Sequence, residues 1–445
     1  MRKSLIAAFV AVSLLGVFGA VPSTDAATAD DELIAICEDL WGDYMEVPTG
    51  EPLAPCQWDM ALIGANRDTF ERATGDGVLV GVLDTGIDFD HPDLAANINA
   101  ELSCSFIFDH DPFALPVEIA NGDCSNKAAV QDYNDHGTHV ATTIAAPING
   151  IGIAGVAPEA TIVGLKVCSA HGFCFHDSVA AALRYAGDVG LDVVNLSLYA
   201  DPYLYYCLND MDQRAMYNEM LEAARYARQQ GVLIVTSAGN GQQNLRHPVI
   251  DDSSPDYPED AAVLRDVGNQ CRVAPAEFPG AVSVMSTGPI GYEGYGLNIA
   301  DYSTVGGDVA APGGDYFQAT GTVQDAILAG ASGTSDEVEG IWTTFDSFGI
   351  PGLTSTQAGG RYIYLNGTSM ASPHVAGVAA LIIEQHPKWG PDAVAAALKR
   401  TANEQPCPAD WAPLSEADER DTCRGGKGHN DFFGHGLVDA AAATR

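Results

Sequence analysis

The chain has 445 residues, of which 47% are hydrophobic and 18% charged, so it can bury a large core and is neither a disordered tail nor a collagen-like repeat. Lys and Arg number 21 against 59 Asp and Glu, which gives a formal net charge of -38. A surface this acidic repels phosphate backbones, so we expect no nucleic acid partner.

The first residues have the layout of a secretory signal peptide. Arg2 and Lys3 precede an apolar stretch over residues 5–21, and a small-residue cleavage site follows at residues 27–29. The apolar stretch is shorter than the roughly 20 residues that a membrane-spanning helix needs. We therefore expect residues 1–29 to be removed and the product to be exported without a membrane anchor.

Ten cysteines form an even set, as is typical of exported proteins with disulfides. Cys104 and Cys124 flank one loop and Cys407 and Cys423 flank another, so we predict these two local bridges. No Cys-x-x-Cys pair occurs, which argues against a zinc ribbon or a thioredoxin-like site. Four others either pair or stay as buried thiols, namely Cys168, Cys174, Cys207 and Cys271.

Apolar runs typical of buried strands recur along the chain. They cover residues 78–83, 161–167, 192–198, 232–237 and 281–285. Helical patterns lie between several of them, at residues 139–146, 177–186 and 211–230. This alternation predicts an α/β fold of three layers, α/β/α, with a mostly parallel central sheet and active groups at the carboxyl ends of its strands. The Gly/Thr/Ser-rich stretch at residues 319–335 indicates a surface loop.

Three short segments contain the residue types that acyl transfer requires. Asp84 follows a strand in VLVGVLDTGID, His136 precedes a helix in DHGTHVA, and Ser369 begins an apolar helix in LNGTSMASPHVAGVAALI. A serine hydroxyl is a weak nucleophile until a base takes its proton, and the base needs a third group to orient it. Each motif alone is a common turn or helix cap, but the three together favour a serine hydrolase.

With these motifs the sequence resembles the subtilisin-like serine proteases, or subtilases, over essentially the whole mature chain. The order Asp, His, Ser is the one found in subtilisin and differs from that of chymotrypsin and of the α/β-hydrolases. The resemblance implies that Ser369 is the nucleophile, His136 the general base and then acid, and Asp84 the group that orients it. Asn240, in SAGN, matches the oxyanion-hole asparagine. His139, Ser372 and His374 fit structural roles.

The resemblance also implies a monomeric serine endopeptidase that cleaves protein or peptide substrates through an acyl-enzyme, without a catalytic metal. The implied substrate cleft is formed by Ser197, Leu198, Tyr199, Ser237, Ala238 and Gly239. Many relatives have Ser-Leu-Gly-Gly where this chain has Ser-Leu-Tyr-Ala. The ring of Tyr199 either walls a subsite or points to solvent. Two alternatives therefore stay open, a narrow-specificity processing protease of an exported partner and a non-catalytic binding module on the same fold.

The chain divides into the signal peptide, a short acidic segment over residues 30–56, and a peptidase domain over residues 57–445. The short segment has too few residues for the compact chaperone-like prodomain that many secreted relatives carry. It is either a cleaved pro-segment or a permanent N-terminal arm. Cys37 and Cys56 could tie it to itself or to the catalytic body.

Two acidic or oxygen-rich segments are candidate cation sites. PINGIGI, ahead of AGVAP, is similar to the calcium loop of the family, and the resemblance implies a structural calcium held by oxygen ligands. The candidate ligands are the Asp93 carboxylate, the Asn149 side chain and the carbonyls of Ile151 and Ile153. A second segment is either a solvated charge run or a further cation site, and it contains Asp251, Asp252, Asp256, Glu259 and Asp260.

Overall fold

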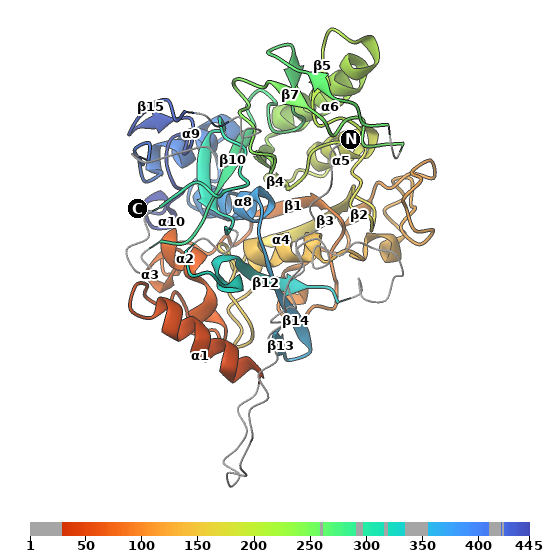
Figure 1. The fold of residues 1–445 in the computed structure, drawn as a ribbon. Coiled ribbons are helices and arrows are strands. Elements are labelled where there is room, and N and C mark those ends of the chain that lie inside the picture. The colour runs from red at the N-terminus through yellow and green to blue at the C-terminus, as the bar shows by residue number, and fades with distance from the viewer. Residues whose placement is uncertain are drawn as a thin grey trace, which may run out of the picture.

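The computed structural model describes residues 29–258, 261–290, 297–315, 319–333, 355–408, 420 and 422–445. Its centre is a seven-stranded sheet in the order β11-β10-β6-β4-β1-β3-β2, in which every neighbouring pair is parallel (Figure 1). In chain order the strands are β1 (Leu79–Asp84), β2 (Cys104–Ser105), β3 (Thr161–Lys166), β4 (Val193–Leu196), β6 (Leu233–Ser237), β10 (Val282–Thr287) and β11 (Val309–Pro312).

Helices cover both faces of this sheet, because strand side chains alternate between the faces. In β4, Val193 belongs to the core formed with α4 and α8, whereas Val194 belongs to the core formed with α5 and α6. In Figure 1, α5 and α6 lie above the strands and α4 lies below them. The predicted three-layer α/β/α fold is confirmed. The four helices are α4 (His136–Ala145), α5 (His176–Asp188), α6 (Met211–Gln230) and α8 (Thr368–Gln385).

The α6 helix shows how local sequence sets the bounds of an element. The Asp210 side chain caps it by accepting hydrogen bonds from the main-chain N–H groups of Asp212 and Gln213, each at 3.0 Å. The helix ends at Gly231, whose φ of 110° is readily available only to glycine. The helix therefore occupies the predicted residues 211–230.

The remaining elements are short or lie at the edges. Further helices are α1 (Ala29–Trp41), α2 (Trp58–Leu62), α3 (Arg67–Phe70), α9 (Pro391–Thr401) and α10 (Ala440–Ala443), with 3₁₀ turns at Ala54–Cys56, Ala95–Asn97, Lys127–Val130 and Val323–Asp325. A second sheet contains β12 (Ile327–Ala331), β14 (Gly360–Leu365) and β13 (Ser355–Gln357), in that order. Three two-stranded ribbons pair β5 (Tyr206–Cys207) with β9 (Cys271–Arg272), β7 (Ile250–Asp251) with β8 (Arg265–Asp266), and β15 (Gly425–Gly426) with β16 (His429–Asn430).

The prediction of a surface loop over residues 319–335 is wrong for Ile327–Ala331. These five residues form β12, all of them are buried, and they pair with β14. Gly330 is required by close packing, since a Cβ there would lie 2.8 Å from the His91 ring and 2.9 Å from the Thr142 methyl group. A glycine in a strand often marks such a close approach. The strand was mistaken for a loop because residues 319–335 have the composition of a loop.

The N-terminal segment packs as part of the body. On α1, Leu33, Cys37 and Trp41 are buried in the same core as α4 and α8. A disulfide joins Cys37 to Cys56, and the rings of Trp41 and Trp58 lie 6.3 Å apart. The predicted signal peptide falls outside the described residues except for the first residue of α1.

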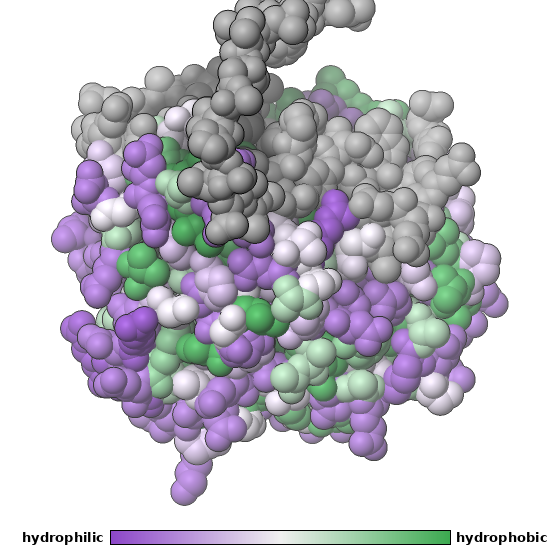
Figure 2. All heavy atoms as spheres, turned by 90° about the horizontal axis from the view of Figure 1, so that it is seen from below, coloured by the Kyte–Doolittle hydropathy of each residue, from purple (hydrophilic) through white to green (hydrophobic). Residues whose placement is uncertain are grey.

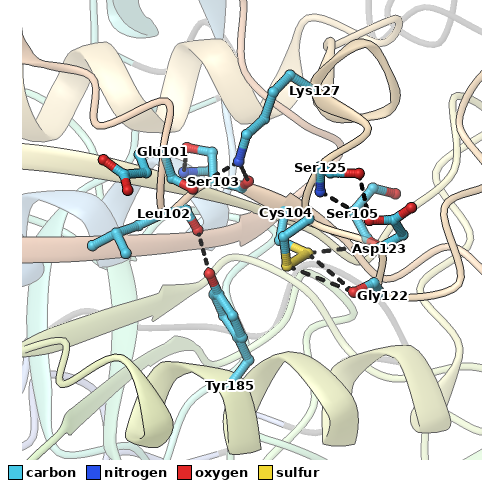
Figure 3. Close-up of a disulfide and its surroundings, with 12 residues drawn as sticks. Glu101, Leu102, Ser103, Cys104, Ser105, Gly122, Asp123, Ser125, Lys127 and Tyr185 are labelled. Carbon is cyan, nitrogen blue, oxygen red and sulfur yellow. Dashed lines mark hydrogen bonds between the residues drawn. A yellow bond between two sulfur atoms is a disulfide. The ribbon is translucent and has the colours of Figure 1, made fainter.

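All ten cysteines are among the described residues, and all are paired. Both predicted local bridges form, and Cys37–Cys56, Cys168–Cys174 and Cys207–Cys271 complete the set. Figure 3 shows Cys104–Cys124 at the base of the excursion that follows β2. Beside it the Tyr185 hydroxyl donates to the main-chain O of Leu102 at 3.0 Å. The bridge attaches the end of the excursion to β2, and the Tyr185 bond attaches the segment just before β2 to α5.

The face of the molecule that Figure 2 shows is mainly polar. Where grey atoms do not cover it, hydrophilic side chains predominate and apolar ones are scattered among them. Within the described ranges, no helix has the length and the apolar character needed to cross a bilayer.

Candidate active site

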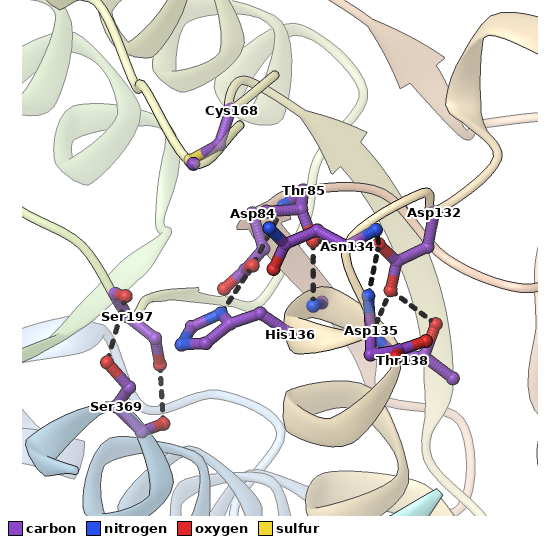
Figure 4. Close-up of polar contacts among 12 residues, drawn as sticks. Asp84, Thr85, Asp132, Asn134, Asp135, His136, Thr138, Cys168, Ser197 and Ser369 are labelled. Carbon is purple, nitrogen blue, oxygen red and sulfur yellow. Dashed lines mark hydrogen bonds and ion pairs between the residues drawn. The ribbon is translucent and has the colours of Figure 1, made fainter. Parts of the chain in front are cut away.

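Asp84 is the last residue of β1, at the carboxyl end of the sheet. Its side chain is 1% exposed, and its Oδ1 accepts hydrogen bonds from the Thr85 main-chain N–H at 2.8 Å and from His136 Nδ1 at 2.7 Å. The chain then turns at Gly86, where φ is 114° and a Cβ would lie 2.4 Å from the Val130 main-chain O. This tight turn holds the carboxylate next to the imidazole (Figure 4).

His136 is the first residue of α4, and a buried network positions its turn. The Thr85 hydroxyl donates to Asp132 Oδ1 at 2.9 Å and accepts from the Gly137 main-chain N–H at 2.9 Å. Asp132 Oδ2 accepts from the Thr138 N–H at 2.9 Å, so it satisfies a free donor of the first helical turn. Burial, and then the nearby Asp135 carboxylate, raises the pKa of Asp132.

The charge of Asp84 controls the basicity of His136. Burial alone would lower the pKa of the imidazole, but the Asp84 carboxylate and its hydrogen bond raise it above the ordinary value. Nδ1 faces a carboxylate oxygen, which only accepts, so Nδ1 carries the hydrogen and Nε2 has a free lone pair. The ring thus presents a base to the side on which Ser369 lies (Figure 4).

Ser369 is the second residue of α8. In this structure its hydroxyl donates to the Ser197 main-chain O at 3.2 Å, and the Ser197 hydroxyl donates to the Ser369 main-chain O at 2.8 Å. The Ser197 Oγ also lies 2.8 Å from the Ser372 Oγ. These contacts fasten the start of α8 to the segment that follows β4.

Asn240 follows β6, and its side chain faces the same space as the start of α8. Its Oδ1 accepts hydrogen bonds from the Thr368 main-chain N–H at 2.9 Å and from the Thr368 hydroxyl at 2.8 Å, which directs the amide NH₂ away from this residue. A Cβ added at Gly367 would lie 3.4 Å from the Ser369 N and 3.6 Å from the Asn240 Nδ2. Two N–H donors therefore flank one space, and the glycine leaves that space open.

These groups line one cleft of about 650 Å³. It contains Asp84, His136, Ser369 and Asn240, and the structure brings all six residues of the predicted substrate cleft to its walls. Tyr199 is 40% exposed, and its hydroxyl donates to Asp256 Oδ2 at 3.0 Å, so the ring belongs to the wall.

Two histidines near the motifs lie outside the cleft lining. The His139 Nε2 lies 3.1 Å from the Ile327 main-chain O, and burial lowers the pKa of His139 to about 3, so the ring is neutral. The His374 Nε2 lies 2.9 Å from Asp59 Oδ2, and its Nδ1 lies 2.8 Å from the Met370 main-chain O. The contact with Ile327 joins α4 to β12 and the contact with Asp59 joins α8 to α2, whereas the contact with Met370 lies within α8, as structural roles require.

Sequence reasoning missed the groups behind the triad. Lys166, the residue paired with Asp84 across β1 and β3, is fully buried and lies 2.7 Å from Glu118 Oε1. The Lys166 ammonium and the Glu118 carboxylate form an ion pair, but their geometry is not that of a hydrogen bond. The ammonium also donates to the main-chain O of Thr85 at 2.5 Å and of Gln131 at 2.8 Å. A lysine inside an apolar strand was the only sequence signal for this pair.

The loop that resembles a calcium site is held by hydrogen bonds within the protein. Asp93 Oδ1 accepts from Asn149 Nδ2 at 3.1 Å, and Asp93 Oδ2 accepts from the Ile153 N–H at 2.9 Å and the Tyr362 hydroxyl at 3.0 Å. The Ile151 N–H donates to Asn149 Oδ1 at 3.0 Å. A cation would need the Asp93 and Asn149 oxygens as ligands, and in this arrangement both side chains accept hydrogen bonds from protein donors. Among the described residues, no group of three or more His, Cys, Asp or Glu is placed to hold a metal ion. The calcium site stays a prediction.

The comparisons agree with this geometry. The model of the subtilase family matches residues 75–436. The chain belongs to the subtilase family. M-protease from Shouchella clausii (strain KSM-K16) is 30% identical over 443 residues, which cover 98% of this subtilase and 83% of that protein. Subtilisin BL from Lederbergia lenta is 30% identical over 391 residues, which cover 87% of this subtilase and 98% of that protein.

Solved structures show the same fold. The crystal structure of fervidolysin, a keratinolytic enzyme related to subtilisin from Fervidobacterium pennivorans, matches with a TM-score of 0.56 at 27% identity. The match covers 89% of this subtilase and 46% of that chain. The family resemblance inferred from the motifs is confirmed, and this subtilase is a serine endopeptidase, a hydrolase that acts on proteins or peptides.

Proposed function

We propose that this subtilase is an exported endopeptidase that cleaves peptide bonds through Asp84, His136 and Ser369. The Ser369 Oγ attacks the carbonyl carbon of the substrate while His136 Nε2 takes the hydroxyl proton. The imidazolium then gives that proton to the leaving amine, which leaves an acyl-enzyme. Water repeats the two steps and releases the acid. The observation that carries this proposal is the 2.7 Å contact between His136 Nδ1 and Asp84 Oδ1 in the cleft that contains Ser369.

The tetrahedral intermediate carries a negative oxygen that needs hydrogen-bond donors. The Ser369 N–H and the Asn240 Nδ2 flank the open space beside Gly367, and the positive end of the α8 dipole points to it. Donors held in place before the reaction stabilise the charge without reorganising. We therefore assign the oxyanion to this space.

Fluorophosphonate labelling and casein hydrolysis test the nucleophile. Ser369→Ala should abolish both, whereas Ser125→Ala, at an exposed serine outside the cleft, should leave both unchanged. Asn240→Ala should lower kcat about 100- to 1,000-fold, the size of effect established for an oxyanion-hole asparagine of subtilisin. A folded wild-type protein that neither labels nor cleaves would favour the non-catalytic binding module.

We also infer that residues 30–56 stay attached to a monomeric, exported enzyme. The burial of their apolar side chains in the core shared with α4 and α8 supports a permanent arm over a removable pro-segment. Five disulfides support export, because such bonds persist in oxidising compartments. N-terminal sequencing and size-exclusion chromatography of the secreted protein test this: a mature N-terminus beyond residue 56, or a dimeric elution volume, would contradict it.

A further inference from the structure

The wall of the cleft next to Tyr199 carries carboxyl groups that the proposed mechanism does not use. Asp201 and Asp252 line the cleft. Asp256 lies beside this wall, because its Oδ2 accepts the hydrogen bond from the Tyr199 hydroxyl. None of the described residues that line the cleft is Lys or Arg. The wall formed by Tyr199, Asp201, Asp252 and Asp256 is here called the acidic wall, because it carries three carboxyl groups and the described cleft lining has no Lys or Arg.

Two carboxyl groups of the acidic wall lie near each other, that of Asp201 buried and that of Asp256 partly exposed. Asp201 is 3% exposed, its Oδ2 accepts a hydrogen bond from the Cys174 main-chain N–H, and the Asp256 carboxyl group lies close enough to act on its pKa. The Asp256 Oδ1 is buried and receives no hydrogen from any described donor. Burial, and then the Asp256 carboxyl group, raises the pKa of Asp201 well above its ordinary value. The pair lacks a cation.

Two buried or half-buried basic residues, Arg265 and Lys166, are bound to other acids. Arg265 forms an ion pair with Asp251 and donates to the Tyr205 main-chain O at 3.0 Å. Lys166 is paired with Glu118. Among the described residues, the carboxyl groups of the acidic wall therefore have no Lys or Arg as an ion-pair partner.

The acidic wall is close to the nucleophile. The Ser369 hydroxyl is bonded to the carbonyl of Ser197, and Asp201 follows Ser197 by four residues. Even a fully extended chain would place Asp201 within about 14 Å of Ser197. A long side chain from a substrate residue near the scissile bond can span much of this distance. The wall is thus part of the substrate cleft.

We propose that the acidic wall is a specificity subsite for a cationic substrate side chain, that of Lys or Arg; the inference rests on the proposed peptidase function. A guanidinium or ammonium group would let Asp201 and Asp256 ionise together and would give the Asp256 Oδ1 its missing donor. The planar guanidinium suits two carboxylates, because it presents several N–H donors in a fixed fork. The Tyr199 hydroxyl holds Asp256 in position for this contact. The subsite makes this subtilase selective for basic peptides.

Paired substrates that differ only in charge test the proposal. Fluorogenic peptides are made with arginine or with its neutral isostere citrulline at each position around the scissile bond. At one position, kcat/KM for the arginine peptide should exceed that for the citrulline peptide by about 10- to 100-fold, since a hydrogen bond to a charged group contributes more than a neutral one. The ratio should fall as salt is added, because salt screens the attraction.

Variants of the acidic wall assign the effect to named residues. Asp201→Asn and Asp256→Asn keep the side-chain shape and the acceptors for Cys174 and Tyr199, and each should reduce the ratio about tenfold. Asp76→Asn is the matched control, because Asp76 is exposed and precedes β1, at the opposite end of the strand from Asp84. It should leave the ratio unchanged.

The outcomes separate this proposal from the peptidase function. Fluorophosphonate labelling of Ser369 with an arginine-to-citrulline ratio near one at every position overturns the subsite and keeps the peptidase. A ratio that persists in both aspartate variants also overturns it. If neither variant folds, the wild-type ratio and its salt dependence decide. Absence of labelling in folded protein overturns the peptidase function itself.

Discussion

The buried pair of Lys166 and Glu118 should be a major contributor to stability beside the catalytic turn. Both side chains are 0% exposed and lie 2.7 Å apart. Lys166→Met removes the ammonium and leaves the Glu118 carboxylate as an uncompensated buried charge. Breaking a buried pair in this way costs about 3 to 5 kcal/mol of the free energy of unfolding.

A second substitution should recover part of this loss. Glu118 Oε2 accepts hydrogen bonds from the main-chain N–H groups of Leu115 at 2.8 Å and Ala170 at 3.2 Å, so Gln at position 118 keeps an acceptor for them. In Lys166→Met/Glu118→Gln no charge remains buried. The double variant should therefore be more stable than Lys166→Met alone, by about 2 kcal/mol if most of the charge penalty is relieved.

Guanidinium chloride unfolding of the four proteins in the double-mutant cycle measures the coupling. The cycle is made in a Ser369→Ala background, which prevents self-digestion during unfolding. Losses that add to within about 0.5 kcal/mol would show that the two side chains do not interact, and would refute this reasoning. In the active background, Lys166→Met should also lower kcat, because the Lys166 ammonium holds the Thr85 carbonyl next to Asp84.

Three further results are expected. On the acid side of the pH profile, kcat/KM should have its midpoint above pH 6.5, because the base works only when neutral and the pKa of His136 is raised. Asp84→Asn removes the charge that raises this pKa, so the midpoint should move to lower pH while kcat falls about 10,000-fold. A midpoint that stays in place would contradict the assigned electrostatics. Replacing Cys37 and Cys56 by Ala should lower the free energy of unfolding by about 3 kcal/mol, since the bridge closes 19 residues of chain; no loss would mean that the arm adds no stability. Chelation by EDTA should leave the melting temperature unchanged, whereas Tyr362→Phe should lower the free energy of unfolding by about 1 kcal/mol; a drop with EDTA alone would restore the calcium site.

Much of the architecture follows from local sequence patterns. The apolar run before Asp84 became β1, and the cap at Asp210 with the glycine at position 231 set both ends of α6. The triad motifs could be recognised in the sequence because each combines a nucleophile, base or acid with a characteristic turn. The bridge between Cys104 and Cys124 could be predicted because the two residues flank one loop. In each case the deciding contacts lie within a short stretch of chain.

Other features became visible only in three dimensions. The loop composition of residues 319–335 hid a buried strand, because Gly330 serves close packing against α4 rather than a turn. The oxygens assigned to calcium carry protein donors, and Tyr362, one of those donors, lies 269 residues from Asp93 along the chain.

What the sequence by itself determined was therefore five of the seven central strands, the family and the candidate triad, since local periodicity and short motifs carry that information. The tertiary structure alone decided which charges are paired. It joined Lys166 to Glu118, and it left Asp201 near Asp256 without a described Lys or Arg as an ion-pair partner. The physical reason is that electrostatic energy depends on distance and burial in space, and both arise only when segments far apart in the chain pack together.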